Sequence, residues 1–190
     1  MRRALRIAVL GGLLGVGCHA GSGARVQSDV RAFEREQSQE RLLARGRAFA
    51  DVGDTVRAQE YLAAALDAGG DEQRITPLLI AVCVRDGRYR LAIDYARRHL
   101  SRRPDDHRVA FLLGALYAGV GEGEAAEQEL ERVTRVDSSN AEARYALAVV
   151  LRDQRGDAAR ASRHFREYLK LSPRGAHAAE ASGFGLERLP

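Results

Sequence analysis

A glycine returns at a nearly constant interval through the middle of the 190-residue chain. Gly53, Gly87 and Gly121 are evenly spaced, and Gly156 comes one residue later than the same spacing would place it. A fixed period of about 34 residues is typical of chains built from copies of one small structural unit. Because glycine readily adopts the left-handed backbone that ends a helix, each of these residues is expected to close a helix. The interval therefore predicts a repeat array rather than one central core.

Alignment on these glycines brings small residues together at two further positions of the period. Such residues let the two helices of one unit approach closely, while large apolar residues fill the seam between them. In the second unit Ile80 stands where a small residue is expected, which leaves the packing of that unit open. With each glycine as the fifteenth residue, the small residues at the eighth and twentieth positions are Gly46, Ala58, Gly114, Ala126, Ala148 and Ala161.

This pattern resembles the tetratricopeptide repeat over about residues 39–173, although the family's tryptophan is absent. The resemblance implies an all-α fold, a right-handed α-α superhelix of four helix-turn-helix repeats followed by a C-terminal capping helix. Residues 29–173 would form the repeat domain and residues 174–190 the cap. The four repeats are expected at about 39–72, 73–106, 107–140 and 141–175.

Polar residues and prolines mark the expected helix ends. Pro104 and Pro173 are expected to stop the second helices of their repeats. The helix in RITPLLIAVCV is expected to start late, with Thr76 as its cap and Pro77 in its first turn. The expected N-caps are Asp54, Asp71, Asp105 and Asp157, and the residues expected to cover the last repeat are Ala178, Ala179, Leu186 and Leu189.

The N-terminus has the layout of a secretory signal, with three arginines, a short apolar core and small residues. The stretch before Cys18 resembles a bacterial lipobox, although Gly15 stands where leucine is usual. This interpretation predicts a signal peptide over residues 1–17, a lipidated Cys18 and a flexible tether over residues 18–28. The alternatives are ordinary cleavage after Ala20 and a retained segment. Secretion would place the protein on the periplasmic side of the envelope, anchored to the outer membrane in the lipidated case.

Charge and residue usage argue against several function classes. Removal of the segment 1–17 would take away three arginines and leave a nearly neutral chain, so the basic pI does not indicate nucleic-acid binding. The histidines share no metal-ligand spacing, and no phosphate-binding loop or serine elbow is present. Asp105, Asp106 and His107 are best interpreted as a solvated turn and a helix cap, and Cys83 as a buried apolar residue. We expect no catalysis, no cofactor, no metal and no small-molecule substrate.

In the family, the first helix of each repeat lines a concave groove. Leu43 and Arg47 stand where some members carry the Lys and Asn that clamp a terminal carboxylate, so that mode is not expected. Apolar inner positions with charged outer ones suit an apolar peptide or an amphipathic helix. Phe111 and Tyr145, one repeat period apart, are expected to anchor it on one wall. The alternative is that these positions are core, or are covered by the segment before Gln39. The predicted groove residues are Leu43, Arg47, Leu78, Arg85, Arg108, Phe111, Leu112, Tyr145, Val149 and Arg152.

These features together predict a non-catalytic interaction scaffold. A lipidated repeat protein of this size is similar to the pilotin-like lipoproteins that help pilus secretins assemble. The alternative is a soluble periplasmic adaptor of an envelope or cell-wall complex that carries no lipid.

Overall fold

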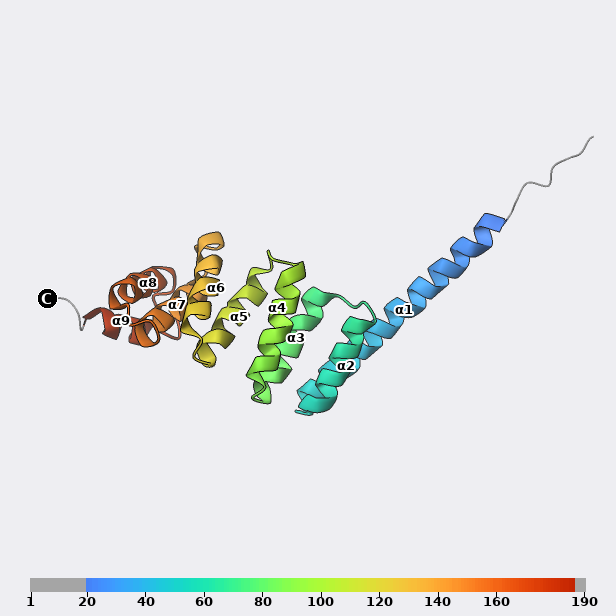
Figure 1. Cartoon of the computed structure of the whole chain (residues 1–190), viewed down its shortest axis with the longest axis horizontal. Helices are drawn as coiled ribbons and strands as arrows, with labels where there is room; N and C mark the ends of the chain where they lie inside the picture. The colour runs from blue at the N-terminus through green and yellow to red at the C-terminus, as the bar shows by residue number, and fades with distance from the viewer. Residues whose placement is uncertain (1–19, 187–190) are drawn as a thin grey trace, which may run out of the picture. The chain divides into compact units, whose positions relative to one another are not determined.

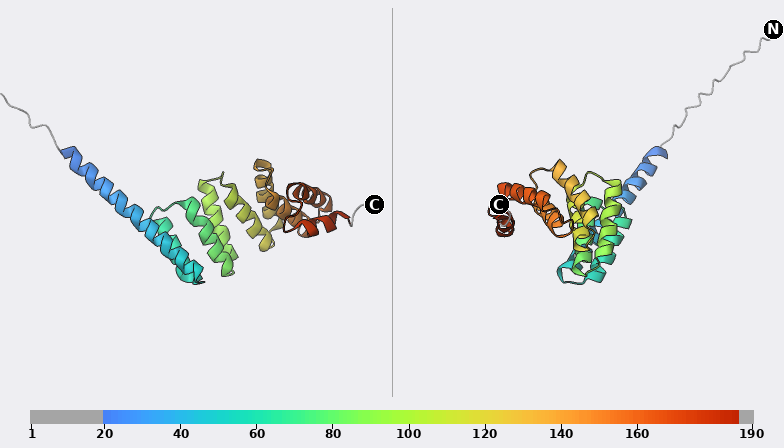
Figure 2. Two further views of the ribbon diagram at one scale, coloured as in Figure 1. Left: turned by 180° about the vertical axis from the view of Figure 1, so that it is seen from behind. Right: turned by 60° about the vertical axis from the view of Figure 1, so that its left-hand side comes forward.

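The computed structural model describes residues 20–186, which are helical wherever they form regular structure. The chain divides into two units, Met1–Gln37 and Ser38–Pro190, and the boundary falls inside the first helix. In the second unit the helices follow one another in chain order, each packed on the next (Figure 1; Figure 2 shows the same order in two other views). The helices are α1 (Ala20–Asp51), α2 (Thr55–Asp67), α3 (Glu72–Arg85), α4 (Tyr89–Arg102), α5 (His107–Gly119), α6 (Gly123–Val136), α7 (Ala141–Asp153), α8 (Ala158–Leu171) and α9 (Ala178–Leu186).

The periodic glycines end the first helix of each pair, as predicted. Gly53, Gly87, Gly121 and Gly156 all have positive φ, between 67° and 81°, a conformation that costs glycine no side-chain clash. After the first of them, the N–H of Asp54 donates to the carbonyl of Phe49 at 2.9 Å, and the next two turns repeat this bond. In the fourth turn the N–H of Asp157 reaches the carbonyl of Leu151, one position further back, which accommodates the inserted residue. Within residues 20–186, four helical hairpins therefore follow one another and form a solenoid.

In the first and third hairpins a glycine of the first helix faces a leucine of the second helix. A Cβ added to Gly114 would lie 2.8 Å from Cγ of Leu130, and one added to Gly46 would lie 2.7 Å from Cγ of Leu62. The atoms nearest Gly114 thus belong to Leu130. In repeat two the sizes are exchanged, because Ile80 and Ala96 stand at the equivalent positions and both are buried in one cluster. The exchange explains how this repeat tolerates the large residue.

Side-chain oxygens cap most of the helices. Asp54, Asp71 and Asp157 accept main-chain N–H bonds, as predicted. For α5 the prediction of Asp105 is wrong by one residue. Asp106 accepts from the N–H of Val109 at 3.3 Å, because its carboxylate also bonds the buried Nε2 of His99 at 3.0 Å.

The helix containing RITPLLIAVCV starts earlier than predicted. Asp71 accepts the N–H of Gln73 at 2.9 Å, so α3 already begins at Glu72. Pro77 consequently lies inside the helix, and Thr76 is a buried helical residue instead of a cap.

The two ends of the described segment also differ from expectation. Helix α1 already begins at Ala20, so residues 20–28 are helical instead of forming a tether. No proline interrupts residues 20–51, which lets the helix propagate. At the other end α9 packs on α8 through Ala181 and Phe184, while Ala179 is exposed. The predicted signal peptide, the predicted lipid site Cys18 and Leu189 lie outside the described residues. Within residues 20–186, no helix combines the length and apolarity needed to span a membrane.

Candidate functional site

The first predicted groove residue is part of the core. Leu43 is 3% exposed and packs in one cluster with Leu62 and Leu79, where α1, α2 and α3 meet. Its position in the repeat points into the seam with the next hairpin, so it offers no surface to a partner. Leu43 is therefore removed from the groove.

Three predicted residues come together on α5. Arg108, Phe111 and Leu112 line a pocket of about 290 Å³, together with His107 on the same helix and Asp137 and Asn140 from the turn after α6. The ring of Phe111 also packs against the buried Ala110, Val133 and Ala143. The pocket thus has an apolar floor that is anchored between repeats three and four. We call it the α5 pocket.

The polar edge of the α5 pocket is built by a turn that the sequence analysis missed. Asn140 caps α7 by accepting the N–H of Ala143 at 2.9 Å. Asp137 accepts both the hydroxyl of Ser139 at 2.7 Å and its N–H at 3.1 Å. These hydrogen bonds lower the pKa of Asp137, with the largest effect from the Ser139 hydroxyl, and they favour the ionised carboxylate. Asn140 stands one repeat period after the α5 cap Asp106, so the repeat spacing could have predicted Asn140 as the cap of α7.

The arginine at the rim of the α5 pocket is open to solvent. The side chain of Arg108 is 75% exposed, and its Nε lies 3.7 Å from Oδ1 of Asp106. Since the contact is long and solvated, the guanidinium remains available to a ligand. With Asp137 across the pocket, the rim offers charges of both signs beside the apolar floor.

The equivalent face of repeat four is covered, which overturns the prediction that Phe111 and Tyr145 share an open wall. The ring of Tyr145 stacks on His177, with centroids 3.8 Å apart, and lies 5.5 Å from the ring of Tyr168. Its hydroxyl donates to Glu180 of α9 at 2.5 Å. Burial, followed by this hydrogen bond, raises the pKa of Tyr145 to about 12. The C-terminal segment therefore occupies the position at which a partner was expected.

Arg152 belongs to the same covered surface. Its guanidinium bonds Asp153 at 2.6 and 2.9 Å and Glu180 at 2.9 Å, and it lies over the rings of Phe165 and Phe184. The pKa of Arg152 is raised, first by its bonds to Asp153, and the pKa of Glu180 is lowered, first by Tyr145. These groups fasten α9 to α7, and we call Tyr145, Arg152, His177 and Glu180 the cap latch. The half-buried Val149 packs against the adjoining core.

The remaining predicted residues lie outside the α5 pocket. Leu78 is half-buried against the core of repeats one and two, and Arg47 is exposed. Arg85 donates to the main-chain carbonyl of Ala50 at 2.5 Å, a bond that ties the end of α3 to the end of α1. Of the predicted groove residues, Arg108, Phe111 and Leu112 thus lie together in the α5 pocket.

Metal-ligand clusters and reactive cysteines were the remaining kinds of site to consider among the described residues. No group of three or more His, Cys, Asp and Glu side chains among residues 20–186 is arranged to hold a metal ion. Cys83 is fully buried, and its burial raises the pKa of the thiol above the usual range.

Several solved structures share this architecture. YrrB, a TPR protein with an unusual peptide-binding site, is 20% identical, with a TM-score of 0.67 over 84% of this chain and 88% of its own. A tetratricopeptide repeat protein from Parabacteroides merdae is 23% identical, with a TM-score of 0.70 over 78% of this chain and 59% of its own. MamA is 19% identical, with a TM-score of 0.69 over 80% of this chain and 86% of its own. At these identities the likeness shows the fold.

Sequence comparison identifies the family. No curated protein matches the chain. Two family models, both described as tetratricopeptide repeat, match residues 43–107 and 84–150. The two together span more than half of the sequence, and the chain therefore belongs to the tetratricopeptide-repeat family.

Proposed function

We propose that this protein is a non-catalytic scaffold that holds a protein partner at the α5 pocket. The observation that carries the proposal is the joining of Phe111 and Leu112 to an open arginine, Arg108, in one pocket. An aromatic anchor in a pocket with a polar rim is the usual centre of a binding surface. The described peptide-binding site of YrrB is consistent with this use of the fold. The partner would present an apolar peptide or the apolar face of an amphipathic helix.

The proposal extends to an envelope location. The arginine-led apolar segment before Cys18 supports export and lipidation at that residue. A lipid-anchored scaffold on the periplasmic side of the outer membrane would suit a pilotin-like role in the assembly of a secretin or pilus. The stretch Cys18-His19-Ala20 favours a second candidate, an adaptor of an envelope complex that is cleaved after Ala20 and carries no lipid.

Intact mass of the mature protein separates the two candidates. Lipidation adds the mass of two or three acyl chains to a chain that begins at Cys18, and Cys18→Ala then releases the protein from membranes. An unmodified chain that begins at Gly21 supports the adaptor and rejects the anchor.

Site-specific cross-linking tests the pocket itself. A photoreactive benzoylphenylalanine is placed at Arg108 on the pocket rim and, as a control, at the exposed Arg97 on α4. We expect cross-links to an envelope protein from position 108 only, and we expect their loss when Phe111 is changed to alanine. A secretin subunit among the products would support the pilotin-like role. Equal cross-linking from both positions would reject the α5 pocket as the binding site.

A further inference from the structure

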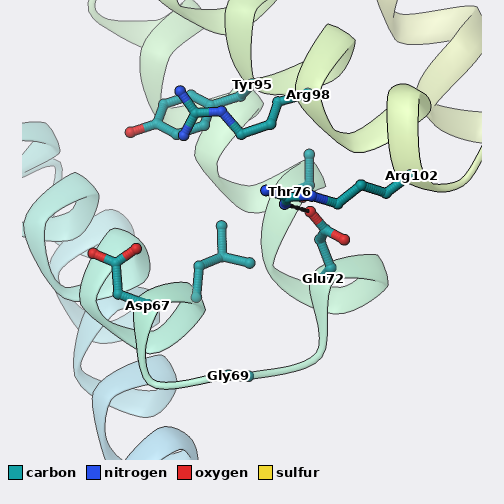
Figure 3. A pocket seen from close by; sticks show the side chains of 9 residues that line it. Asp67, Gly69, Glu72, Thr76, Tyr95, Arg98 and Arg102 are labelled. Carbon is teal, nitrogen blue, oxygen red and sulfur yellow. Dashed lines mark hydrogen bonds and ion pairs between the residues drawn. The ribbon is translucent and has the colours of Figure 1, made fainter.

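A second pocket lies on the α2 and α4 side of the solenoid, beside the turn between repeats one and two. It has a volume of about 320 Å³ and shares no residue with the α5 pocket. Figure 3 shows Tyr95 and Arg98 side by side on α4, with Asp67 at the end of α2 and Gly69 of the α2–α3 turn across from them. We call it the α4 pocket.

The α4 pocket is lined by hydrogen-bond donors that lack acceptors. Arg98 is an exposed residue, and its guanidinium makes no hydrogen bond or ion pair with any residue in the described part of the chain, so only solvent competes with a ligand for it. Thr76 is only 2% exposed, and its hydroxyl has no hydrogen-bond partner among residues 20–186. The Tyr95 oxygen accepts from Nε2 of Gln59 at 3.4 Å, which leaves its own proton to donate. A ligand that accepts hydrogen bonds would therefore satisfy several groups of the pocket at once.

The neighbouring arginine, by contrast, has a partner within the chain. Arg102 also lines the pocket, but its Nη1 bonds Oε1 of Glu72 at 2.7 Å (dashed line in Figure 3). Arg102 is thus already paired with a carboxylate of the chain, whereas Arg98 is not.

The equivalent place between repeats two and three, which we call the second junction, shows which hydrogen-bond acceptor is missing between repeats one and two, the first junction. Arg132 stands one repeat period after Arg98 and donates two hydrogen bonds to Oε2 of Glu129, at 2.9 and 3.1 Å. It also donates to the carbonyl of Pro104 at 2.7 Å. There, a carboxylate and a main-chain carbonyl of the chain itself satisfy the arginine.

Two sequence differences leave the first junction open. Tyr95 stands at the position of Glu129, so no carboxylate faces Arg98 from that position of its own helix. Gly69 and Gly70 stand at the positions of Arg103 and Pro104, so no side chain of the turn fills the space. The first junction therefore lacks the carboxylate that the second one contains.

We propose that the α4 pocket binds a carboxylate from an acidic segment of a protein partner, which takes the place that Glu129 holds beside Arg132. The planar guanidinium of Arg98 can bind a carboxylate through two hydrogen bonds, and the hydroxyls of Thr76 and Tyr95 add donors. Leu66 supplies apolar surface for the neighbouring part of a peptide. The carboxylates of Asp67 and Glu72 repel a doubly charged anion such as phosphate more strongly than a singly charged carboxylate.

A peptide titration followed by NMR on the full chain tests the assignment. The probe is acetyl-Ala-Glu-Leu-amide, and its control is the same peptide with glutamine in place of glutamate. We expect the glutamate peptide to shift the amide signals of Gly69 and Gly70 saturably and the glutamine peptide to leave them unmoved. Arg98→Ala should weaken binding by about tenfold or more, because a charge-assisted bond is lost. The matched variant Arg97→Ala should bind within about twofold of the parent, since the exposed Arg97 does not line the pocket.

A second variant fills the pocket from within. Tyr95→Glu introduces the glutamate–arginine pair that the next repeat junction contains, and it should abolish peptide binding. As a control for folding, Arg98→Ala should have the same helical circular dichroism as the parent. Undiminished binding to Arg98→Ala, or equal binding of the glutamine peptide, would overturn the proposal. Acetate that binds as tightly as the peptide would overturn the assignment to a protein partner. Shifts confined to the amides of Phe111 and Leu112 would move the peptide to the α5 pocket, a result that supports the scaffold function and rejects this second site.

Discussion

Repeats three and four carry aromatic residues at the same repeat position, and the two residues have different surroundings. Phe111 keeps part of its ring at the α5 pocket, beside Leu112 and the exposed Arg108. Tyr145, one period later, stacks on His177 and bonds Glu180 of α9. The repeat position determines which way each ring points, while the next element of the chain determines whether the ring is covered.

The difference arises from the helix that comes after each repeat. Repeat three is succeeded by α7, which meets Phe111 through the small Ala143. Repeat four is succeeded by the short helix α9, whose preceding turn brings His177 onto the Tyr145 ring. A groove in this solenoid is therefore available only where small residues of the next helix leave it open.

The largest effect should come from removal of the covered aromatic. Tyr145→Ala is expected to lower the free energy of unfolding by about 3 kcal/mol, because the half-buried ring loses its stacking on His177, its contact with Tyr168 and the bond to Glu180. Phe111→Ala should cost about 1–2 kcal/mol, because its half-buried ring loses apolar contacts with Ala110, Val133 and Ala143. Urea denaturation followed by circular dichroism measures both. Equal losses would mean that the stacking and the hydrogen bond of Tyr145 add nothing to stability.

The effects on partner affinity should have the opposite order, with the larger loss at Phe111. Phe111→Ala is expected to weaken the partner's affinity by about 2 kcal/mol, as for the truncation of an aromatic anchor. Tyr145→Phe keeps the ring under the cap and should leave the affinity unchanged. Titration calorimetry with the purified partner that cross-linking identifies gives both affinities. A larger loss for Tyr145→Phe would place the binding surface on repeat four.

The cap latch should weaken when its carboxylate loses its charge. Glu180→Gln is expected to cost about 1 kcal/mol, since a charge-assisted acceptor becomes neutral. The folded pKa of Glu180 lies below its ordinary value, so its contribution is full near neutral pH and is lost as the pH falls below about 4. Acid titration of the α9 amide signals by NMR should show this release in the parent and not in the variant. The exposed Glu124→Gln on α6 is the control, and a similar change there would remove Glu180 as the cause.

The two predicted rim arginines should give the smallest and most distinct effects. Arg108→Ala should slow association with an acidic-flanked partner by a few-fold at low salt, because an exposed charge acts mainly on the rate of encounter. Arg152→Ala should leave association unchanged and lower stability, since its charge is held by Asp153 and Glu180. Stopped-flow association at two salt concentrations tests the first statement. Equal slowing by both variants would show that the cap opens before binding.

Much of the fold could be predicted because the period acts locally. Each of the periodic glycines ends a helix through its own backbone preference, and the small residues Gly46 and Gly114 meet partners within their own hairpins. The α5 cap was misplaced by one residue because the deciding contact, His99 with Asp106, comes from the preceding helix. The candidate site was predicted in part for the same reason: Arg108, Phe111 and Leu112 are neighbours on one helix, whereas Asp137 and Asn140 come from the next turn.

The sequence by itself determined the hairpins and their number, because helix periodicity, glycine conformation and a fixed repeat period are properties of neighbouring residues. Only the tertiary structure decided which of those residues are covered. Leu43 is sealed by packing against α2 and α3, Tyr145 by α9, and Arg98 is left without the carboxylate that Arg132 has. Burial depends on what the next helix brings to a shared surface, and a repeat pattern specifies the positions of that surface without specifying its occupants.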